Sequence, residues 1–262
     1  MDSRRGLGLI LALVATSAHA DPAPDPTDND RMWTTARIAA EGGTYLALEF
    51  GLNAEISPTH CRWCNPDAFD AAMADALAWR NTGLANTISD ATGYVLAPVV
   101  MSAGLVAAGW GHGVRRAFDD VAPIVEAAIV VSLMQHLSKL TVARARPYVV
   151  HAAPGTLTPS VEDDVSFWSG HTSLTFSLAV AAGSVASLRG YALAPEIWAT
   201  GLSLAFVTGY LRIAADKHWT TDVLTGAAIG SIIGYIWPRY IHRWIRKDVS
   251  ITSNGIALSG SF

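Results

Sequence analysis

Long apolar segments separated by short polar stretches dominate the chain after its first third. Five of these segments carry at most one charge each, and they cover residues 92–110, 121–138, 171–188, 197–211 and 223–237. The first is about the length needed to cross a bilayer as a helix, and the last three are a little short. Their many small residues suit close helix packing in a membrane, and they suit the buried helices of a compact soluble bundle as well.

The remaining segments have weaker patterns. Three charged residues interrupt 33–51, which predicts an amphipathic helix lying beside the bundle. Residues 52–91 predict a loop that contains a short helix at 68–79. Near the end, Asn254-Gly255 stands between short alternating runs, a pattern typical of a hairpin. No earlier segment alternates like a strand, so we predict an all-α fold: a membrane-embedded multi-helix bundle with a short hairpin-like C-terminal tail.

The first twenty residues have the features of a secretory signal. Arg4 and Arg5 precede a short apolar run, and Ala18-His19-Ala20 fits a small-x-small cleavage site. We expect a signal peptide or an uncleaved signal anchor, followed by an unstructured leader rich in Pro and Asp. The predicted organisation is a signal over 1–20, a leader, amphipathic helix and cysteine loop over 21–91, a helical core over 92–247 and a tail over 248–262.

Composition agrees with a membrane protein. Apolar residues make up 51% of the 262 positions and charged residues 15%, whereas soluble domains average roughly 25% charged residues. The net charge of -4 gives no basic patch for nucleic acid. We therefore expect the membrane, and no nucleic acid, as a partner.

The two cysteines, Cys61 and Cys64, lie close together in the predicted loop. A signal sequence implies an oxidising compartment, so we interpret them as a short-range disulfide. A zinc site would need more ligands than the neighbouring His60 supplies. A thioredoxin-like redox role would need a βαβ context, which the sequence does not offer.

Three polar clusters stand at the edges of the apolar segments. The first is "KLTVARARP", in which Lys139 and Arg146 are seven residues apart, close to two helical turns. We expect them to share one helix face, with Pro147 ending the helix. Two cations at a helix end suggest an anion site, although this cluster alone would equally suit a basic flank on the cytoplasmic side of a membrane.

The second cluster is Ser169-Gly170-His171, directly before an apolar segment. A helix N-terminus offers free backbone N–H groups to an anion. Gly170 lets the backbone approach an oxyanion closely, and Ser169 can cap the helix and donate its hydroxyl to the same anion. His171 then lies in the first turn, near whatever the cap binds.

The third cluster contains Arg212, His218 and Asp222. His218 and Asp222 are four residues apart, so they lie on one face of a helix. A carboxylate bonded to one ring nitrogen of a histidine fixes its tautomer and makes the other nitrogen a better nucleophile. A structural His–Asp pair would have the same spacing.

Taken together and in this order, Lys-x6-Arg-Pro, Ser-Gly-His and Arg-x5-His-x3-Asp resemble the type 2 phosphatidic acid phosphatase / vanadium haloperoxidase superfamily. The motifs cover residues 139–222, and the apolar helices extend the resemblance to about 90–240. Two positions depart from the family pattern: Trp168 stands where Pro is usual, and Leu211 where Ser is usual. Neither departure removes a charged or titrating group.

The resemblance implies a phosphohydrolase that uses no metal and no other cofactor. Its phosphate site would consist of three cations, a hydroxyl and a backbone amide, from Lys139, Arg146, Arg212, Ser169 and Gly170. His218 would attack phosphorus to form a phosphohistidine, and Asp222 would orient its ring. His171 would protonate the leaving oxygen and then help to activate water.

The apolar surroundings favour a lipid phosphate or pyrophosphate as the substrate. We expect a bacterial inner-membrane enzyme whose active site faces the periplasm. The alternative is a soluble periplasmic acid phosphatase of the same superfamily that acts on small phosphate monoesters. A haloperoxidase is disfavoured because those proteins are much larger, and a non-enzymatic scaffold is disfavoured because every motif residue with a charged or titrating group is present.

Overall fold

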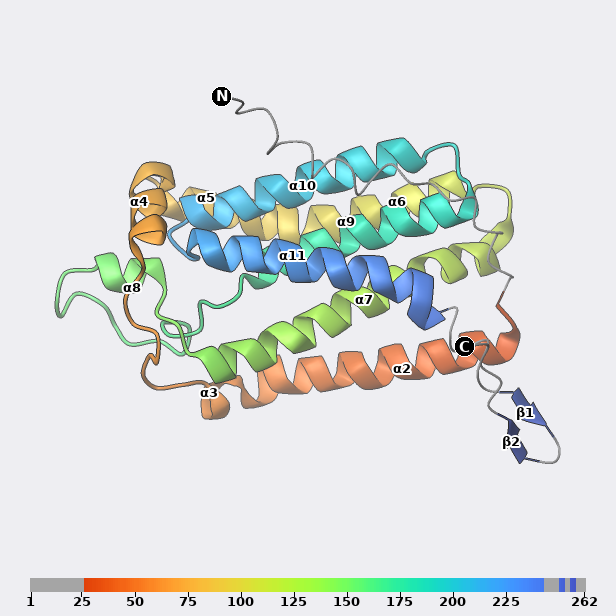
Figure 1. Ribbon diagram of the computed structural model, residues 1–262, viewed down its shortest axis with the longest axis horizontal. Coiled ribbons are helices and arrows are strands. Elements are labelled where there is room, and N and C mark those ends of the chain that lie inside the picture. The colour runs from red at the N-terminus through yellow and green to blue at the C-terminus, as the bar shows by residue number, and fades with distance from the viewer. Residues whose placement is uncertain (1–25, 243–249, 253–254, 258–262) are drawn as a thin grey trace, which may run out of the picture.

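The protein forms an elongated bundle of helices that run roughly along one direction (Figure 1). The computed structural model describes residues 26–242, 250–252 and 255–257. The helical elements follow one another as α2 (Asp28–Leu46), η1 (Ala47–Leu52), α3 (Asn53–Ile56), α4 (Ala68–Leu77), α5 (Thr82–Asp90), η2 (Ala91–Leu96), α6 (Ala97–Ala108), α7 (Gly113–Val142), α8 (Pro147–His151), α9 (Gly170–Arg189), α10 (Ala194–Ala214), α11 (Thr220–Ile236) and η3 (Trp237–Ile241). The all-α class is confirmed, as is the tail pairing, because strands β1 (Ser250–Thr252) and β2 (Gly255–Ala257) are antiparallel.

Helix α9 is the centre of the bundle. It packs against α6, α7, α10 and α11, and nearly all of its residues from His171 to Ala186 are buried. Small side chains permit this packing. A Cβ placed on Gly230 of α11 would lie 2.3 Å from the carbonyl oxygen of Ser173 in α9. The two helices therefore touch backbone to backbone.

Helix α2 is joined to the bundle differently. Two arginines on α2 reach carboxylates on α7: Arg31 Nη2 lies 2.7 Å from Asp119 Oδ2, and Arg37 Nε lies 2.6 Å from Glu126 Oε1. Few of its residues are buried. A helix thus lies beside the bundle in this part of the chain, beginning at Asp28 where the pattern predicted residue 33, and ion pairs hold it in place.

The predicted apolar segments are helical in the structure. Three of the described helices are long and apolar enough to cross a membrane: Thr82–Ala108, Gly170–Arg189 and Ala194–Ala214. The segment 92–110 belongs to the first, which begins ten residues earlier than we predicted. The segments 121–138 and 223–237 also form helices, in α7 and at α11 with the start of η3, but they are not among these three.

Two local predictions are wrong. Helix α7 ends at Val142 because Ala143 adopts the left-handed conformation, with φ of 50°. Pro147 then begins α8 instead of ending a helix, so Lys139 and Arg146 do not share a helix face. In addition, the end of the acidic leader is not irregular, since Thr27 and Asp30 form a capping box that starts α2.

The loops separate into two groups at opposite ends of the long axis. At one end Arg189 Nε bonds Asp120 Oδ1 at 2.8 Å, and Arg115 Nη1 bonds Asp28 Oδ1 at 2.9 Å. At the other end lie α3, α4, α8 and the starts of α5 and α11 (Figure 1). The predicted signal at 1–20 lies outside the described residues.

Candidate active site

The three polar clusters meet in one cavity of about 300 Å³ at the second end of the bundle. Helices α2, α5, α7, α9 and α10, with η1, η2 and the loops after α8 and α10, contribute to its wall. The cavity is lined by Tyr45, Glu49, Asn86, Tyr94, Ser132, Gln135, Lys139, Arg146, Glu162, Gly170, His171, Leu174, Arg212, Lys217 and His218. Six of the eight predicted site residues line it, and Ser169 and Asp222 lie behind its wall.

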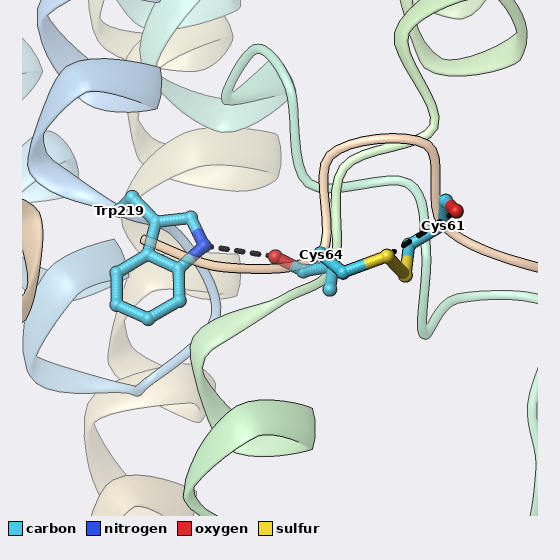
Figure 2. Close-up of a disulfide and its surroundings, with 4 residues drawn as sticks. Cys61, Cys64 and Trp219 are labelled. Carbon is cyan, nitrogen blue, oxygen red and sulfur yellow. Dashed lines mark hydrogen bonds between the residues drawn. A yellow bond between two sulfur atoms is a disulfide. The ribbon is translucent and has the colours of Figure 1, made fainter. Parts of the chain in front are cut away.

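A disulfide-closed loop braces the segment that carries the first cluster. Cys61 and Cys64 are bonded, as predicted, with their Cα atoms 5.2 Å apart (Figure 2). Inside this loop Trp63 pairs with the chain after α7: its N–H donates to the carbonyl of Ala143 at 3.2 Å, and its own carbonyl accepts from the N–H of Ala145 at 3.0 Å. On the other side of that segment, Trp219 Nε1 donates to the Ala145 carbonyl at 2.8 Å. The segment leading to Arg146 is thus held from two sides.

Arg146 is fixed by the loop before α9. Its Nε and Nη2 donate to the carbonyl and carboxylate of Glu162 at 2.6 and 2.7 Å, and its Nη1 donates to the Lys217 carbonyl at 3.2 Å. Burial alone would raise the pKa of Glu162, but the cations Arg146 and Lys139 outweigh burial and lower it. Glu162 is therefore ionised and balances part of the positive charge. The sequence gives no signal for Glu162, because nothing distinguishes this residue from its acidic neighbours Asp163 and Asp164.

The Ser-Gly-His triplet begins α9 as predicted. Ser169 is the N-cap, and its Oγ accepts from the Thr172 N–H at 3.4 Å and from the Thr172 hydroxyl at 2.9 Å. It is buried and does not line the cavity, whereas Gly170 does. A Cβ on Gly170 would lie 3.2 Å from the side-chain carbon of Gln135. The missing side chain at this position therefore leaves room for the α7 side chain opposite.

His171 and Arg212 share acceptors on α5. The Nε2 of His171 lies 2.7 Å from Asp90 Oδ1, and Arg212 Nη1 lies 3.4 Å from the same oxygen. Arg212 Nη1 also donates to Asn86 Oδ1 and Ser89 Oγ, both at 2.9 Å. The loop predicted over residues 52–91 gives no indication of these partners. The four-residue spacing of Asn86 and Asp90, just before an apolar segment, was the available signal.

His218 lies in the turn before α11 and is almost completely buried. Its Nδ1 lies 2.8 Å from the Ser166 carbonyl, so Nδ1 carries the proton and Nε2 carries the lone pair. Arg146 Nη1 lies 3.4 Å from Nε2. Burial, followed by the nearby cations Arg146 and Arg212, lowers the pKa of His218 well below its ordinary value. The ring is therefore neutral near neutral pH.

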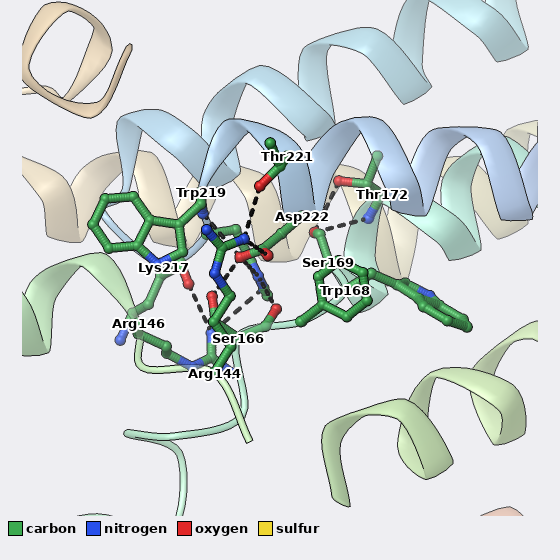
Figure 3. Close-up of polar contacts among 12 residues, drawn as sticks. Arg144, Arg146, Ser166, Trp168, Ser169, Thr172, Lys217, Trp219, Thr221 and Asp222 are labelled. Atoms are coloured by element: carbon green, nitrogen blue, oxygen red, sulfur yellow. Dashed lines mark hydrogen bonds and ion pairs between the residues drawn. The ribbon is translucent and has the colours of Figure 1, made fainter. Parts of the chain in front are cut away.

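Asp222 lies near His218, but its bonds go to other groups. Figure 3 shows Ser166, Trp219 and Arg144 around its carboxylate. Its Oδ2 is 3.7 Å from His218 Nδ1, which is beyond hydrogen-bond range. That oxygen accepts from the Ser166 hydroxyl at 2.5 Å and the Trp219 N–H at 3.0 Å, while Oδ1 lies 2.5 Å from Arg144 Nη1. The direct His–Asp hydrogen bond expected from the four-residue spacing is not formed, because the Ser166 carbonyl takes the imidazole proton.

The charged side chains that line the cavity are those of lysine, arginine and glutamate. Among the residues that the structure describes, no group of three or more His, Cys, Asp or Glu side chains comes together in a way that could hold a metal ion. The arrangement combines four cations, Lys139, Arg146, Arg212 and Lys217, with a buried neutral imidazole and a second histidine. Such a site can bind a tetrahedral oxyanion and move one proton.

Known proteins are similar to parts of this chain. The family model described as the PAP2 superfamily matches residues 120–246. A lipid A 1-phosphatase from Porphyromonas gingivalis is 35% identical over 80 residues, which are 30% of this chain and 17% of that protein. An undecaprenyl-diphosphatase from Sulfolobus acidocaldarius is 28% identical over 114 residues, which are 43% of this chain and 51% of that protein. The chain thus spans at most about half the length of these two relatives.

Two solved structures are also similar. Aquifex aeolicus LpxE aligns with 65% of this chain and 93% of its own at 27% identity, with a TM-score of 0.47. The transmembrane PAP2-type phosphatidylglycerolphosphate phosphatase from Bacillus subtilis aligns with 81% of this chain and 96% of its own, at 15% identity and a TM-score of 0.50. The second likeness shows a common fold. The residues 120–246 that match the PAP2 superfamily model contain all three motifs, so this part of the chain is similar to that superfamily.

Proposed function

We propose that the protein is a membrane phosphatase that hydrolyses a lipid phosphate or pyrophosphate through a phosphohistidine on His218. The observation that carries this proposal is the environment of that ring. The Ser166 carbonyl holds its Nδ1 proton, and Arg146 Nη1 lies 3.4 Å from its Nε2 in a cavity that Lys139 and Arg212 also line. The names of the two curated relatives, a lipid A 1-phosphatase and an undecaprenyl-diphosphatase, support a lipid-linked phosphate as the substrate.

In the first step the lone pair on His218 Nε2 attacks phosphorus, and a P–N bond forms as the bond to the leaving oxygen breaks. Lys139, Arg146 and Arg212 hold the equatorial oxygens and stabilise their charge, together with the N–H of Gly170. His171 gives its proton to the leaving oxygen.

In the second step a water oxygen attacks phosphorus, the P–N bond breaks and phosphate leaves. His171, now neutral, takes the proton from this water.

Asp222 acts on His218 without a direct hydrogen bond to its ring. Its carboxylate lies 3.7 Å from the ring, where it stabilises the positive charge that the imidazole gains on phosphorylation. Through Ser166 it also holds the backbone that orients the ring.

The site residues supply the positive charge that phosphoryl transfer requires, so we propose that the reaction needs no metal and no other cofactor. We also propose that the protein lies in a bacterial inner membrane with the cavity facing the periplasm. Arg115 in the first turn of α7 and Arg189 at the end of α9, at the end opposite the cavity, support this orientation, since basic residues that flank membrane segments stay cytoplasmic. The disulfide near the cavity suits an oxidising compartment.

The test is turnover by the purified full-length protein in detergent micelles with a long-chain phosphate monoester or diphosphate. We expect phosphate release that survives EDTA, inhibition by vanadate, which resembles five-coordinate phosphorus, and a radiolabelled protein adduct that is stable in alkali and lost in acid. Turnover that stops in EDTA and returns with magnesium would refute the metal-independent mechanism. Absence of the adduct under single-turnover conditions would refute the phosphohistidine.

The soluble acid phosphatase remains the second candidate, because the same site can accept small monoesters. Carbonate washing of a membrane fraction separates the two. A protein that spans the bilayer stays in the pellet, whereas a soluble periplasmic protein is released. The three apolar helices favour the first result.

A further inference from the structure

A buried ion chain lies behind the wall of the candidate active site. Arg144 Nη2 lies 2.6 Å from Asp70 Oδ2, and Arg144 Nη1 lies 2.5 Å from Asp222 Oδ1. The side chain of Arg144 is 1% exposed and both carboxylates are 0% exposed. Arg144 is only two residues from Arg146, but it does not line the cavity. Arg144 therefore binds the carboxylate of Asp222 behind His218 and does not contact the cavity.

Each residue of this ion chain, formed by Asp70, Arg144 and Asp222, is also held by other contacts. Asp70 accepts from the N–H and hydroxyl of Thr221, at 2.9 and 2.6 Å, which ties α4 to the first turn of α11. The guanidinium of Arg144 stacks on the ring of Trp63 at 3.7 Å and donates to the Thr221 hydroxyl at 2.7 Å. A planar guanidinium held on a ring and between two carboxylates has little freedom to reorient.

The order of charges matters for the ring of His218. Arg144 partly neutralises the negative charge of Asp222, because it binds one of the carboxylate oxygens of Asp222 directly. Asp70 competes for the same guanidinium and so weakens that effect. In a buried site these interactions are stronger than in water. The balance between the two carboxylates determines how much negative charge Asp222 presents to the imidazole 3.7 Å away.

We propose that Asp70 and Arg144 are positioning residues that set the charge presented by Asp222 and thereby the basicity of the nucleophile His218. This inference rests on the proposed function for its catalytic meaning, while its electrostatic part stands on the geometry alone. Removing the charge of Asp70 strengthens the hold of Arg144 on Asp222 and makes His218 less basic. Removing the charge of Arg144 frees Asp222 and makes His218 more basic.

Other charged groups also act on the ring, and they are the same in every variant compared below. They line the same cavity from η1, α7, α9 and α10 and from the loops beside α8 and α10, and they are Glu49, Lys139, Arg146, Glu162, His171, Arg212 and Lys217. None of them contacts Asp70 or Arg144 in the described part of the chain. A difference in basicity between variants therefore reports on the ion chain.

The experiment is a pH titration by nitrogen NMR of protein labelled at histidine, in detergent micelles, with His218 assigned by its loss in His218→Asn. We expect the pKa of His218 to fall in Asp70→Asn and to rise in Arg144→Gln, each by about 1 unit. Asp75→Asn is the matched control. It removes an equal charge from an exposed position of the same helix, and it should leave the titration unchanged.

A structural role alone would not produce opposite shifts. Loss of activity in Asp70→Asn with an unmoved His218 titration, or shifts of the same sign in the two variants, would overturn the inference. If Arg144→Gln does not fold, Arg144→Lys can replace it. Arg144→Lys retains the charge, so the pKa of His218 should be the same as in the wild type. The downward shift of this pKa in Asp70→Asn then tests the inference. The titration needs no turnover, so it remains informative if no phosphatase activity is found. Where turnover is found, the acid limb of kcat/KM should move with the NMR pKa.

Discussion

The two histidines at the cavity have the same side chain and different partners. His171 Nε2 meets a carboxylate, Asp90, at 2.7 Å. His218 Nδ1 meets a backbone carbonyl, that of Ser166, at 2.8 Å, and its nearest carboxylate oxygen is 3.7 Å away. A carboxylate partner fixes the orientation of the first ring through Nε2, whereas a carbonyl partner orients the second ring through Nδ1 and leaves the lone pair on its Nε2. In the proposed mechanism the first ring is the proton donor and the second the nucleophile.

Replacing His218 should give the largest effect. His218→Ala removes the atom that attacks phosphorus, so we expect turnover to fall roughly 10⁴-fold or more, for every substrate whatever its leaving group. Phosphate release and adduct formation in single-turnover assays measure this. A stable fold is checked by thermal unfolding of the same preparation. An alkali-stable adduct that still forms in His218→Ala would assign the nucleophile to another residue.

Replacing His171 should be severe only where the leaving oxygen needs a proton. For His171→Ala we expect a loss of about 10²- to 10⁴-fold with an alkyl phosphate. With nitrophenyl phosphate, whose leaving group departs as a stable anion, the loss should be much smaller. The ratio of the two kcat/KM values is the measurement. Equal losses with both substrates would mean that His171 acts on binding and not as the acid.

Replacing Asp90 tests whether its carboxylate affects proton donation by His171. Asp90→Asn keeps the shape of the side chain but removes its charge, so we expect roughly a tenfold loss of kcat with an alkyl phosphate. The matched control is Asp75→Asn, which changes an exposed acidic residue on α4 away from the cavity. A loss that is equal with nitrophenyl phosphate would contradict the proposed link through His171.

The smallest expected effect is on pH dependence. Because the pKa of His218 is lowered, the ring stays neutral as the pH falls, and kcat/KM should hold to well below pH 6.5 before it declines. Arg146→Gln removes a cation beside Nε2, so the pKa of His218 should rise and the acid limb should move upward, by about 1 unit. Its kcat/KM will also fall, because phosphate loses a ligand. An acid limb that stays in place or moves downward would contradict this account.

The fold was largely predictable because its helices are long apolar segments, and the motif residues were predictable because their spacing is local. The partners of those residues were not. Asp70, Asp90 and Glu162 are ordinary acidic residues in the sequence. Asp70 and Asp90 pair with residues far away in the chain, and Glu162 pairs with Arg146 across an irregular loop. The end of α7 was also hidden, since Ala143 takes a left-handed conformation without the glycine that usually marks such a position.

Position 226 fixes the width of the candidate active site. A Cβ on Gly226 of α11 would lie 2.7 Å from the carbonyl oxygen of Ser169, the residue that caps α9. That is too close for a carbon and a backbone oxygen, so any larger residue would drive the two helices apart. The turn that carries His218 leads directly into α11, and Gly170 follows the cap on α9. A single added methyl group would therefore widen the gap that phosphorus must bridge between the attacking nitrogen and the amide that holds its oxygens.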